Sequence, residues 1–266
     1  MPSGSYRRLI TASLAVLWLG SAVAAPADLE VHALDTDLRR QLAAHMQTVR
    51  TAPTAAAYAA RGECHFRLGE FEPALRDFEE ALRLDPRQGD ALYGRGMARG
   101  RLGDLAGAIA DLGRYLEHHP DSSLALTKRG VRHIWQGDFE RARLDLERAV
   151  ALDPANAEAH DDLGVVLAQQ RLYPQAIEHF LAAQQADPGY KKPHHNLALV
   201  RHLLGEQAAA LEAVDRALRL DPASRGSLLL KAAILRTLGR EDEARAAREE
   251  AEFLPEGNWS ESSTLR

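Results

Sequence analysis

The stretch "AHDDLGVVLAQQRLYPQAIEHFLAAQQADP", residues 159–188, contains two segments of helical character separated by a short turn. Apolar side chains recur at intervals of three and four residues over 157–170 and again over 173–186, which predicts two amphipathic helices. The pair Asp187-Pro188 ends the second segment, because the residue before a proline is driven out of the α region. The stretch therefore predicts a helical hairpin.

The same pattern returns along the chain with a constant period. Prolines follow one another at a spacing of 34 residues, at Pro86, Pro120, Pro154, Pro188 and Pro222. Alignment on these prolines produces three columns of small residues. The columns are Gly62, Gly96, Gly130 and Gly164 with Ala198 and Ala232; Gly69, Gly103, Gly137, Gly205 and Gly239 with Arg171 as the exception; and Ala74, Ala108, Ala142, Ala176, Ala210 and Ala244. Together they define six repeats from residue 55 to about residue 258.

Each column has a physical reason. The glycine between the two helices supplies the backbone freedom that the turn needs, and it ends the first helix. Small residues inside the helices allow two helix axes to approach closely. A single hairpin cannot bury its apolar face alone, whereas stacked neighbours can, so the repetition itself indicates a solenoid.

In these residues the chain resembles the tetratricopeptide repeat (TPR) family. The matching residues within 159–188 are Leu163, Gly164, Leu167, Tyr173, Ala176, Phe180, Ala183 and Pro188. The resemblance implies an all-α protein, a right-handed α-solenoid of about six TPR helix-turn-helix repeats with an N-terminal capping helix. We expect the array to span 55–254, divided into 55–88, 89–122, 123–156, 157–190, 191–224 and 225–255.

Two columns depart from the pattern of the family. The tryptophan that the family favours early in the first helix is replaced by Tyr58, Leu92, Leu126, His160, His194 and Leu228. In the first three repeats the leucine before the small residue is replaced by Arg61, Arg95 and Arg129. Neither departure changes the expected fold.

The two ends of the array are expected to be capped. Residues 25–54 are predicted to form a linker and a capping helix, with the amphipathic helix over 35–50. The last helix, "REDEARAAREEAEF", is polar enough to close the array, because terminal repeats need a soluble outer face. The remaining tail, 255–266, is polar and predicted to be disordered.

Residues 1–24 are predicted to be a cleavable signal peptide. Arg7 and Arg8 precede a short apolar run, and Ala22-Val23-Ala24 supplies the small residues of a cleavage site. An uncleaved membrane anchor is the alternative. No cysteine follows the apolar run, so a lipid anchor is not expected. We therefore expect an exported protein of bacterial type, periplasmic or secreted, with no membrane span in the mature chain.

The composition narrows the class of function. The net charge is −5 with both signs spread along the 266 residues, so no basic stripe predicts a nucleic-acid partner. Cys64 is the single cysteine, which excludes an internal disulfide and a cysteine-based zinc site. Almost every residue from 55 to 253 is accounted for by helix packing, and no further domain is left for a catalytic pocket. We expect no catalytic residue, no metal, no cofactor and no small-molecule substrate.

One cluster in "GYKKPHHNLALVRHLLG", residues 189–205, first suggests chemistry. His195 and His202 share a helix face, but seven residues rise about 10.5 Å, whereas nitrogens that share a zinc ion lie within about 2.1 Å of it. His194 occupies the aromatic column and is expected to pack between helices. A metal site is therefore not expected here.

The resemblance implies that one column lines the concave face of the solenoid, where we expect a protein or peptide partner. The candidate groove residues are Asp90, Tyr93, Met97, Thr127, Val131, Ile134, Glu158, Asp161, Val165, Lys192, His195 and His202. The alternative is that Glu158 with Lys192, and Asp161 with His195, form surface ion pairs of little energy. A pairing of His195 with Asp161 also predicts that the histidine holds a proton more tightly and makes binding pH-sensitive.

Two functions fit this sequence. The chain is expected to be a non-catalytic scaffold or adaptor of the cell envelope that binds partners on its concave face. The alternative is a structural subunit of an envelope secretion, pilus or cell-wall machine that uses its convex face or its ends. TPR domains that bind chaperone C-termini need lysine, arginine and asparagine at five positions. Asn196 fits one, but Asp161, Val165, Gly226 and Leu230 occupy the others, so a C-terminal carboxylate is not the expected ligand.

Overall fold

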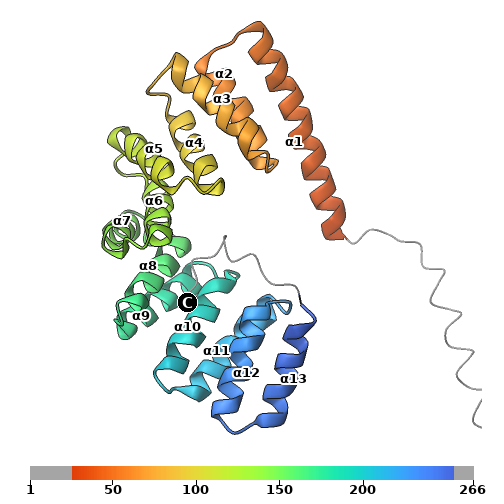
Figure 1. The fold of residues 1–266 in the computed structure, drawn as a ribbon, viewed down its shortest axis with the longest axis vertical. Helices are drawn as coiled ribbons and strands as arrows, with labels where there is room; N and C mark the ends of the chain where they lie inside the picture. Colours follow the sequence, from red (N-terminus) through yellow and green to blue (C-terminus); the bar gives the residue numbers. More distant parts are fainter. Residues whose placement is uncertain (1–25, 255–266) are drawn as a thin grey trace, which may run out of the picture.

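The computed structural model describes residues 26–254, with side chains from residue 36 onward, and this part of the chain is all α-helical (Figure 1). A long helix, α1 (Pro26–Thr51), precedes six helical hairpins. The hairpins are α2 (Ala55–Arg67) with α3 (Phe71–Leu84), α4 (Gly89–Arg101) with α5 (Leu105–His118), α6 (Ser123–Gln136) with α7 (Phe139–Leu152), α8 (Ala157–Gln169) with α9 (Tyr173–Ala186), α10 (Lys191–Leu203) with α11 (Gln207–Leu220), and α12 (Arg225–Thr237) with α13 (Glu241–Glu252). The predicted solenoid of helix pairs is confirmed.

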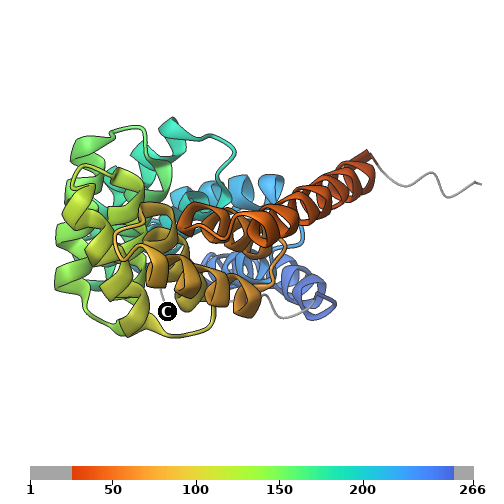
Figure 2. The ribbon, with the colours of Figure 1, turned by 90° about the horizontal axis from the view of Figure 1, so that it is seen from above.

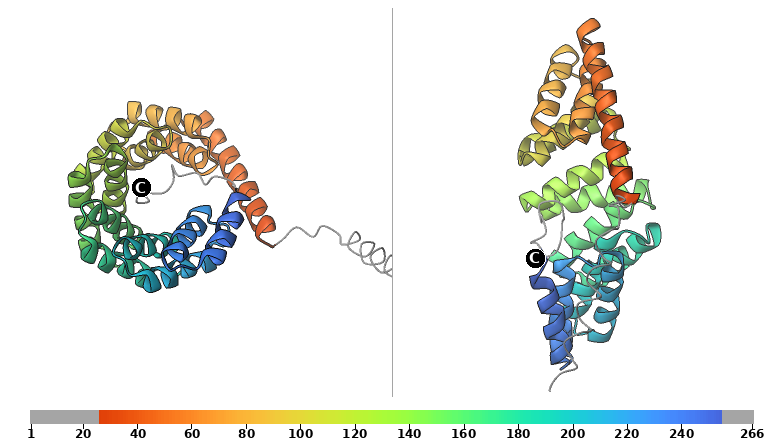
Figure 3. Two further views of the ribbon diagram at one scale, coloured as in Figure 1. Left: turned by 60° about the horizontal axis from the view of Figure 1, so that its bottom comes forward. Right: turned by 90° about the vertical axis from the view of Figure 1, so that its right-hand side faces the viewer.

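The hairpins stack in sequence order and the stack curves. Each even-numbered helix from α2 to α10 contacts the even-numbered helix of the next repeat, whereas no successive odd-numbered helices from α3 to α13 touch. The first helices of the repeats therefore converge on the inside of the curve and the second helices spread on the outside, as the views in Figures 2 and 3 show. We call the face made by the even-numbered helices the inner surface.

The column of small residues marks the closest approach of the two helices of a hairpin. A Cβ atom added at Gly164 would lie 2.6 Å from the ring of Phe180, and one added at Gly130 would lie 2.8 Å from the Cγ of Leu146. The alanine that faces the same contact from the second helix, Ala176 in the fourth repeat, is fully buried. The predicted reason for this column is confirmed.

The turn column also behaves as predicted. Its five glycines have positive φ angles between 73° and 86°, the left-handed conformation that ends a helix. Arg171 replaces glycine in the fourth repeat and adopts the same conformation, with φ of 62°. The turn therefore keeps its geometry even where the side chain makes that geometry costly.

The arginines that depart from the family pattern bind carboxylates of the second helix. Arg129 donates two hydrogen bonds to Asp145, from Nε at 2.7 Å and from Nη2 at 2.6 Å. Arg61 with Asp77 and Arg95 with Asp111 repeat this bidentate pair in the first two hairpins. The three pairs link the two helices of their hairpins, and in the fifth repeat Leu197 and Ala213 stand at the same positions.

The ends of the array differ in detail from the prediction. Helix α1 begins at Pro26, so the segment expected to be a linker before residue 35 is helical, and α1 packs on α2. Helix α13 buries only Ala244, Ala247 and Ala251, in keeping with a polar cap. The predicted signal peptide (1–24) and tail (255–266) lie outside the described residues.

Candidate functional site

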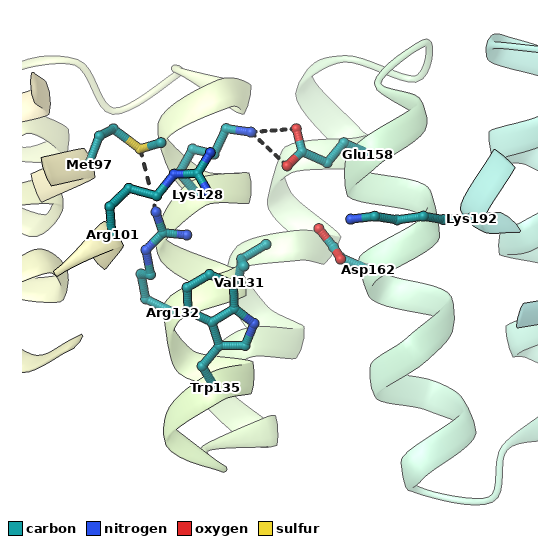
Figure 4. A pocket seen from close by; sticks show the side chains of 9 residues that line it. All are labelled: Met97, Arg101, Lys128, Val131, Arg132, Trp135, Glu158, Asp162 and Lys192. Atoms are coloured by element: carbon teal, nitrogen blue, oxygen red, sulfur yellow. Dashed lines mark hydrogen bonds and ion pairs between the residues drawn. The ribbon is translucent and has the colours of Figure 1, made fainter. Parts of the chain in front are cut away.

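A pocket opens on the inner surface where helices of four successive repeats meet (Figure 4). It encloses a hollow of about 180 Å³ and receives side chains from α4, α6, α8 and α10. The lining residues are Met97, Arg101, Lys128, Val131, Arg132, Trp135, Glu158, Asp162 and Lys192. This is the candidate binding site of the protein.

The pocket includes part of the predicted groove. Met97, Val131, Glu158 and Lys192 line it. Tyr93 lies nearby on α4, half-buried, with its ring centroid 5.5 Å from that of Tyr115. Burial raises the pKa of Tyr93 to about 12, so its hydroxyl stays protonated at neutral pH. Of the remaining groove candidates, Asp90 is exposed, and Ile134 and His202 are half-buried.

Three predicted groove residues are buried between helices. Thr127, Asp161 and Val165 have exposed fractions of 0%, 0% and 1%. The carboxylate of Asp161 accepts hydrogen bonds from Asn196 Nδ2 at 2.9 Å and from the Tyr190 hydroxyl at 3.4 Å. The surface available to a partner therefore excludes these three side chains.

Sequence reasoning missed five of the pocket residues: Arg101, Lys128, Arg132, Trp135 and Asp162. Lys128, Arg132 and Trp135 follow one another at spacings of four and three, so they share one face of α6. That face adjoins the predicted column, of which Val131 also lines the pocket and Thr127 is buried. The helical spacing of the three residues was a usable signal.

One ion pair crosses between repeats at the edge of the pocket. Glu158 accepts from Lys128 Nζ, with both carboxylate oxygens at 2.6 Å. Lys128 belongs to the preceding repeat. This pair fixes one wall of the pocket between α6 and α8.

The histidines of 189–205 have separate surroundings. His194 is 8% exposed and packs in the array with neither ring nitrogen hydrogen-bonded. His195 Nδ1 lies 3.0 Å from Ser227 Oγ, and His202 Nδ1 lies 2.6 Å from Gln207 Oε1. Among the described residues, no group of three or more histidine, cysteine, aspartate or glutamate side chains is placed to hold a metal ion.

The predicted pairing of His195 with Asp161 is wrong. His195 contacts Ser227 of the following repeat, whereas Asp161 contacts Asn196 and Tyr190. Burial lowers the pKa of His195 to about 4, the opposite of the predicted direction. The imidazole is therefore neutral at mildly acidic pH, and the proposed mechanism for pH-sensitive binding does not apply.

We expect this neutral histidine to make stability depend on pH. The pKa of His195 is 6.5 in its ordinary state and about 4 in the folded protein, so between these values the unfolded chain binds the proton more readily. The free energy of unfolding should then fall as pH drops from 6.5 toward 4, by on the order of 1–3 kcal/mol from this residue. Thermal melts recorded at intervals across this window should show a flatter pH dependence for His195→Gln.

The matched control for this prediction is His118→Gln, because His118 is exposed on α5. Burial also lowers the pKa of four other histidines, His133, His160, His179 and His194. Part of the dependence of unfolding free energy on pH should therefore remain in His195→Gln. An identical slope in wild type and His195→Gln would contradict the prediction.

Cys64 has no features of a reactive thiol. Its side chain is 4% exposed within α2, and burial raises the pKa of the thiol above its ordinary value. The reactive thiolate is thus disfavoured. None of the helices that the structure describes has the length and hydropathy needed to cross a bilayer.

Comparison with solved structures places the fold among known helical arrays. The chain is similar to a structure described as the APC/C hetero-tetramer Cut9–Hcn1, with TM-score 0.74 and 20% identity, over 89% of this chain and 47% of that chain. It is similar to pilF of Pseudomonas aeruginosa, with TM-score 0.65 and 21% identity over 73% and 88% of the two chains. YrrB, described as a TPR protein with an unusual peptide-binding site, has TM-score 0.57 and 23% identity over 70% and 96%. This chain therefore spans about half the length of the Cut9–Hcn1 chain.

Sequence comparison identifies the repeats themselves. Family models described as tetratricopeptide repeat match residues 55–88, 90–122, 127–191 and 192–224. These matches cover five of the six hairpins, from α2 to α11. None of the curated proteins matches the sequence.

Proposed function

Because the chain belongs to the tetratricopeptide repeat family, we propose that it is a non-catalytic scaffold that binds a protein or peptide partner on its inner, concave surface. Proteins of this family are typically scaffolds of this kind. The observation that carries the choice of face is the pocket, which opens on the inner surface and draws side chains from α4, α6, α8 and α10. YrrB, which has the same fold, is described as having a peptide-binding site, and this supports a peptide as the partner.

The chemistry of the inner surface suits an extended segment with apolar anchors. Tyr93 and Met97 are half-buried on one face of α4, and Val131 on α6 continues the apolar strip. An aromatic ring and a flexible thioether adapt to different side chains at little cost. Charged groups at Glu158 and Lys192 flank the strip and can fix the orientation of the bound segment.

We expect charged substitutions on this strip to abolish partner capture. In the double variant Tyr93→Glu/Met97→Glu, two carboxylates replace the apolar anchors, so binding should weaken at least tenfold, which corresponds to about 1.4 kcal/mol. Binding is measured by capture from a cell-envelope fraction, followed by titration of the captured partner. A photo-crosslinking amino acid placed at Met97 should label the same partner.

The matched control is Leu144→Glu, because Leu144 is 63% exposed on α7, on the outside of the curve. Thermal melts of all variants separate a loss of binding from a loss of folding. If Leu144→Glu abolishes capture and the Tyr93/Met97 variant does not, the convex face is the binding face. That result would favour a structural subunit of a secretion, pilus or cell-wall machine.

We also propose that the protein acts in the cell envelope after export. The support is the sequence of residues 1–24, with its basic start, apolar run and small-residue cleavage site. Amino-terminal sequencing of the protein from its native cells provides the test. A start at Ala25 supports export, and a start at Met1 counts against it.

A further inference from the structure

One charged side chain in the pocket is buried without a carboxylate partner. Arg132 on α6 is 4% exposed. Arg61, Arg95 and Arg129 are more exposed, yet each donates two hydrogen bonds to an aspartate. Arg132 instead donates from Nη2 to the sulfur of Met97 at 3.8 Å, and its Nε is buried without a hydrogen bond.

The surroundings hold this guanidinium in place. A Cβ atom at Gly100 would overlap the Arg132 Nε, so the side chain crosses α4 through a gap that only glycine leaves open. The guanidinium carbon lies 4.7 Å from the centre of the Trp135 ring, a cation–π contact. Figure 4 shows one terminal nitrogen at the methionine sulfur and the other directed toward the hollow. The arginine is therefore positioned before any ligand arrives.

The pocket as a whole carries an excess of positive charge. Arg101, Lys128, Arg132 and Lys192 line it against two carboxylates, Glu158 and Asp162, which leaves an excess of two positive charges in a protein of net charge −5. Glu158 is already bound to Lys128 through both oxygens. Burial and the charge of nearby Arg101 lower the pKa of Arg132, whereas the charges of Glu158 and Asp162 raise it. An anion bound between the two arginines would offset their mutual repulsion.

An apolar wall adjoins the charged one. Val131 is 7% exposed, and the ring of Trp135 and the thioether of Met97 are half-buried beside Arg132. An anion that enters the pocket on a peptide can therefore place a neighbouring apolar side chain against this wall. The excess of positive charge attracts any such anion, and a side-chain carboxylate is the anion that an unmodified peptide supplies.

We propose that this pocket recognises an acidic side chain, aspartate or glutamate, next to an apolar residue in a bound peptide, with its carboxylate held by Arg132 and Arg101. This inference rests on the proposed function and adds the chemistry of the partner. The site differs from the positions that bind a C-terminal carboxylate in other TPR domains, because those positions fall at Asp161, Val165, Asn196, Gly226 and Leu230.

The test uses the full chain and an immobilised library of capped octapeptides, in which one position carries aspartate, glutamate, asparagine, glutamine or phosphoserine before an apolar residue. Wild type should prefer the acidic peptides over the matched amides by at least tenfold. Arg132→Met should abolish this preference. Arg101→Gln changes an exposed side chain, so it tests the site without disturbing the core, and it should reduce the preference severalfold. Arg141→Gln, on the outer helix α7, is the charge-matched control and should have no effect.

Several outcomes would overturn the proposal. Two results would refute recognition of an acidic side chain by this pocket but leave the scaffold function supported. One is peptide binding without an acidic preference, and the other is a preference that persists in both Arg132→Met and Arg101→Gln. Stronger binding of phosphoserine than of glutamate would assign the pocket to a phosphopeptide. A preference seen only after Glu256 and Glu261 are changed to glutamine would make the chain's own tail the occupant. No binding of any peptide would count against the proposed function itself.

Discussion

Replacing Phe180 with alanine is expected to lower the free energy of unfolding by about 3–5 kcal/mol, one of the largest effects of any single substitution in the chain. Phe180 is fully buried, and its ring covers the backbone of α8 at Gly164, where an added Cβ atom would lie 2.6 Å away. Removing the ring leaves a cavity at the centre of the array, because neighbouring hairpins on both sides hold α8 and α9 apart. Equilibrium denaturation with urea, followed by circular dichroism, measures the change.

The adjacent residue supplies the control. Leu181 is 44% exposed on the same helix, so Leu181→Ala should change the free energy of unfolding by less than about 0.5 kcal/mol. In an array of repeats a local cavity can also let the repeats before it and the repeats after it unfold separately. Phe180→Ala should therefore broaden the urea unfolding transition. Equal midpoints for Phe180→Ala and Leu181→Ala would contradict the expected role of the ring.

Removing the carboxylate of Asp145 is expected to destabilise the protein by about 2–4 kcal/mol. Asp145 is 7% exposed and accepts both hydrogen bonds that Arg129 donates. In Asp145→Ala the guanidinium stays between α6 and α7 without its partner, with its side chain only 25% exposed. The cost arises mainly from the unpaired charge, and the same urea denaturation measures it.

A double variant separates the unpaired charge from the lost contact. In the fifth repeat the same two columns hold Leu197 and Ala213, both buried. Arg129→Leu/Asp145→Ala copies this apolar pair into the third repeat and should recover most of the stability that Asp145→Ala loses, because a buried ion pair contributes little more than a well-packed apolar one. If the double variant is as unstable as Asp145→Ala, the expectation is wrong, and the ion pair itself stabilises the protein more than an apolar pair at the same positions.

These ion pairs are confined to one part of the solenoid. Hairpins one to three join their helices through arginine and aspartate, whereas the same columns hold Leu163 and His179 in the fourth hairpin and Leu197 and Ala213 in the fifth. The candidate pocket lies at the boundary, with Arg101 and Arg132 from the first half and Asp162 and Lys192 from the second. A partner bound there would contact both halves and stabilise their stacking.

The fold was predictable because its determinants are local. The glycine at 164 and the ring at 180 belong to one hairpin, and so do the turn residue at 171 and the helix end at Pro188. Each requirement concerns residues fewer than 34 positions apart, and each is repeated in neighbouring units, so a misread position in one repeat is corrected by the others. Even the exceptions, Arg171 in the turn and Arg129 in the helix, occupy the places that the repeat assigns to them.

The site was only partly predictable because it is built between repeats. The 34-residue repeat does not decide whether His195 contacts the preceding or the following repeat. The twist of the stacked hairpins brings it to Ser227 and not to Asp161. The same twist pairs Glu158 with Lys128, and it buries Asp161 against Asn196. These contacts depend on the angles between hairpins, and the spacing of residues along the sequence does not give those angles.

The sequence alone therefore determined the repeat, the helix boundaries to within a few residues and the turn conformations, since all of these follow from packing within one hairpin. Only the tertiary structure decided which side chains reach the inner surface. Arg132 illustrates the reason: its path over Gly100, its contact with Trp135 and its lack of a carboxylate all depend on the distance between α4 and α6, helices of different repeats.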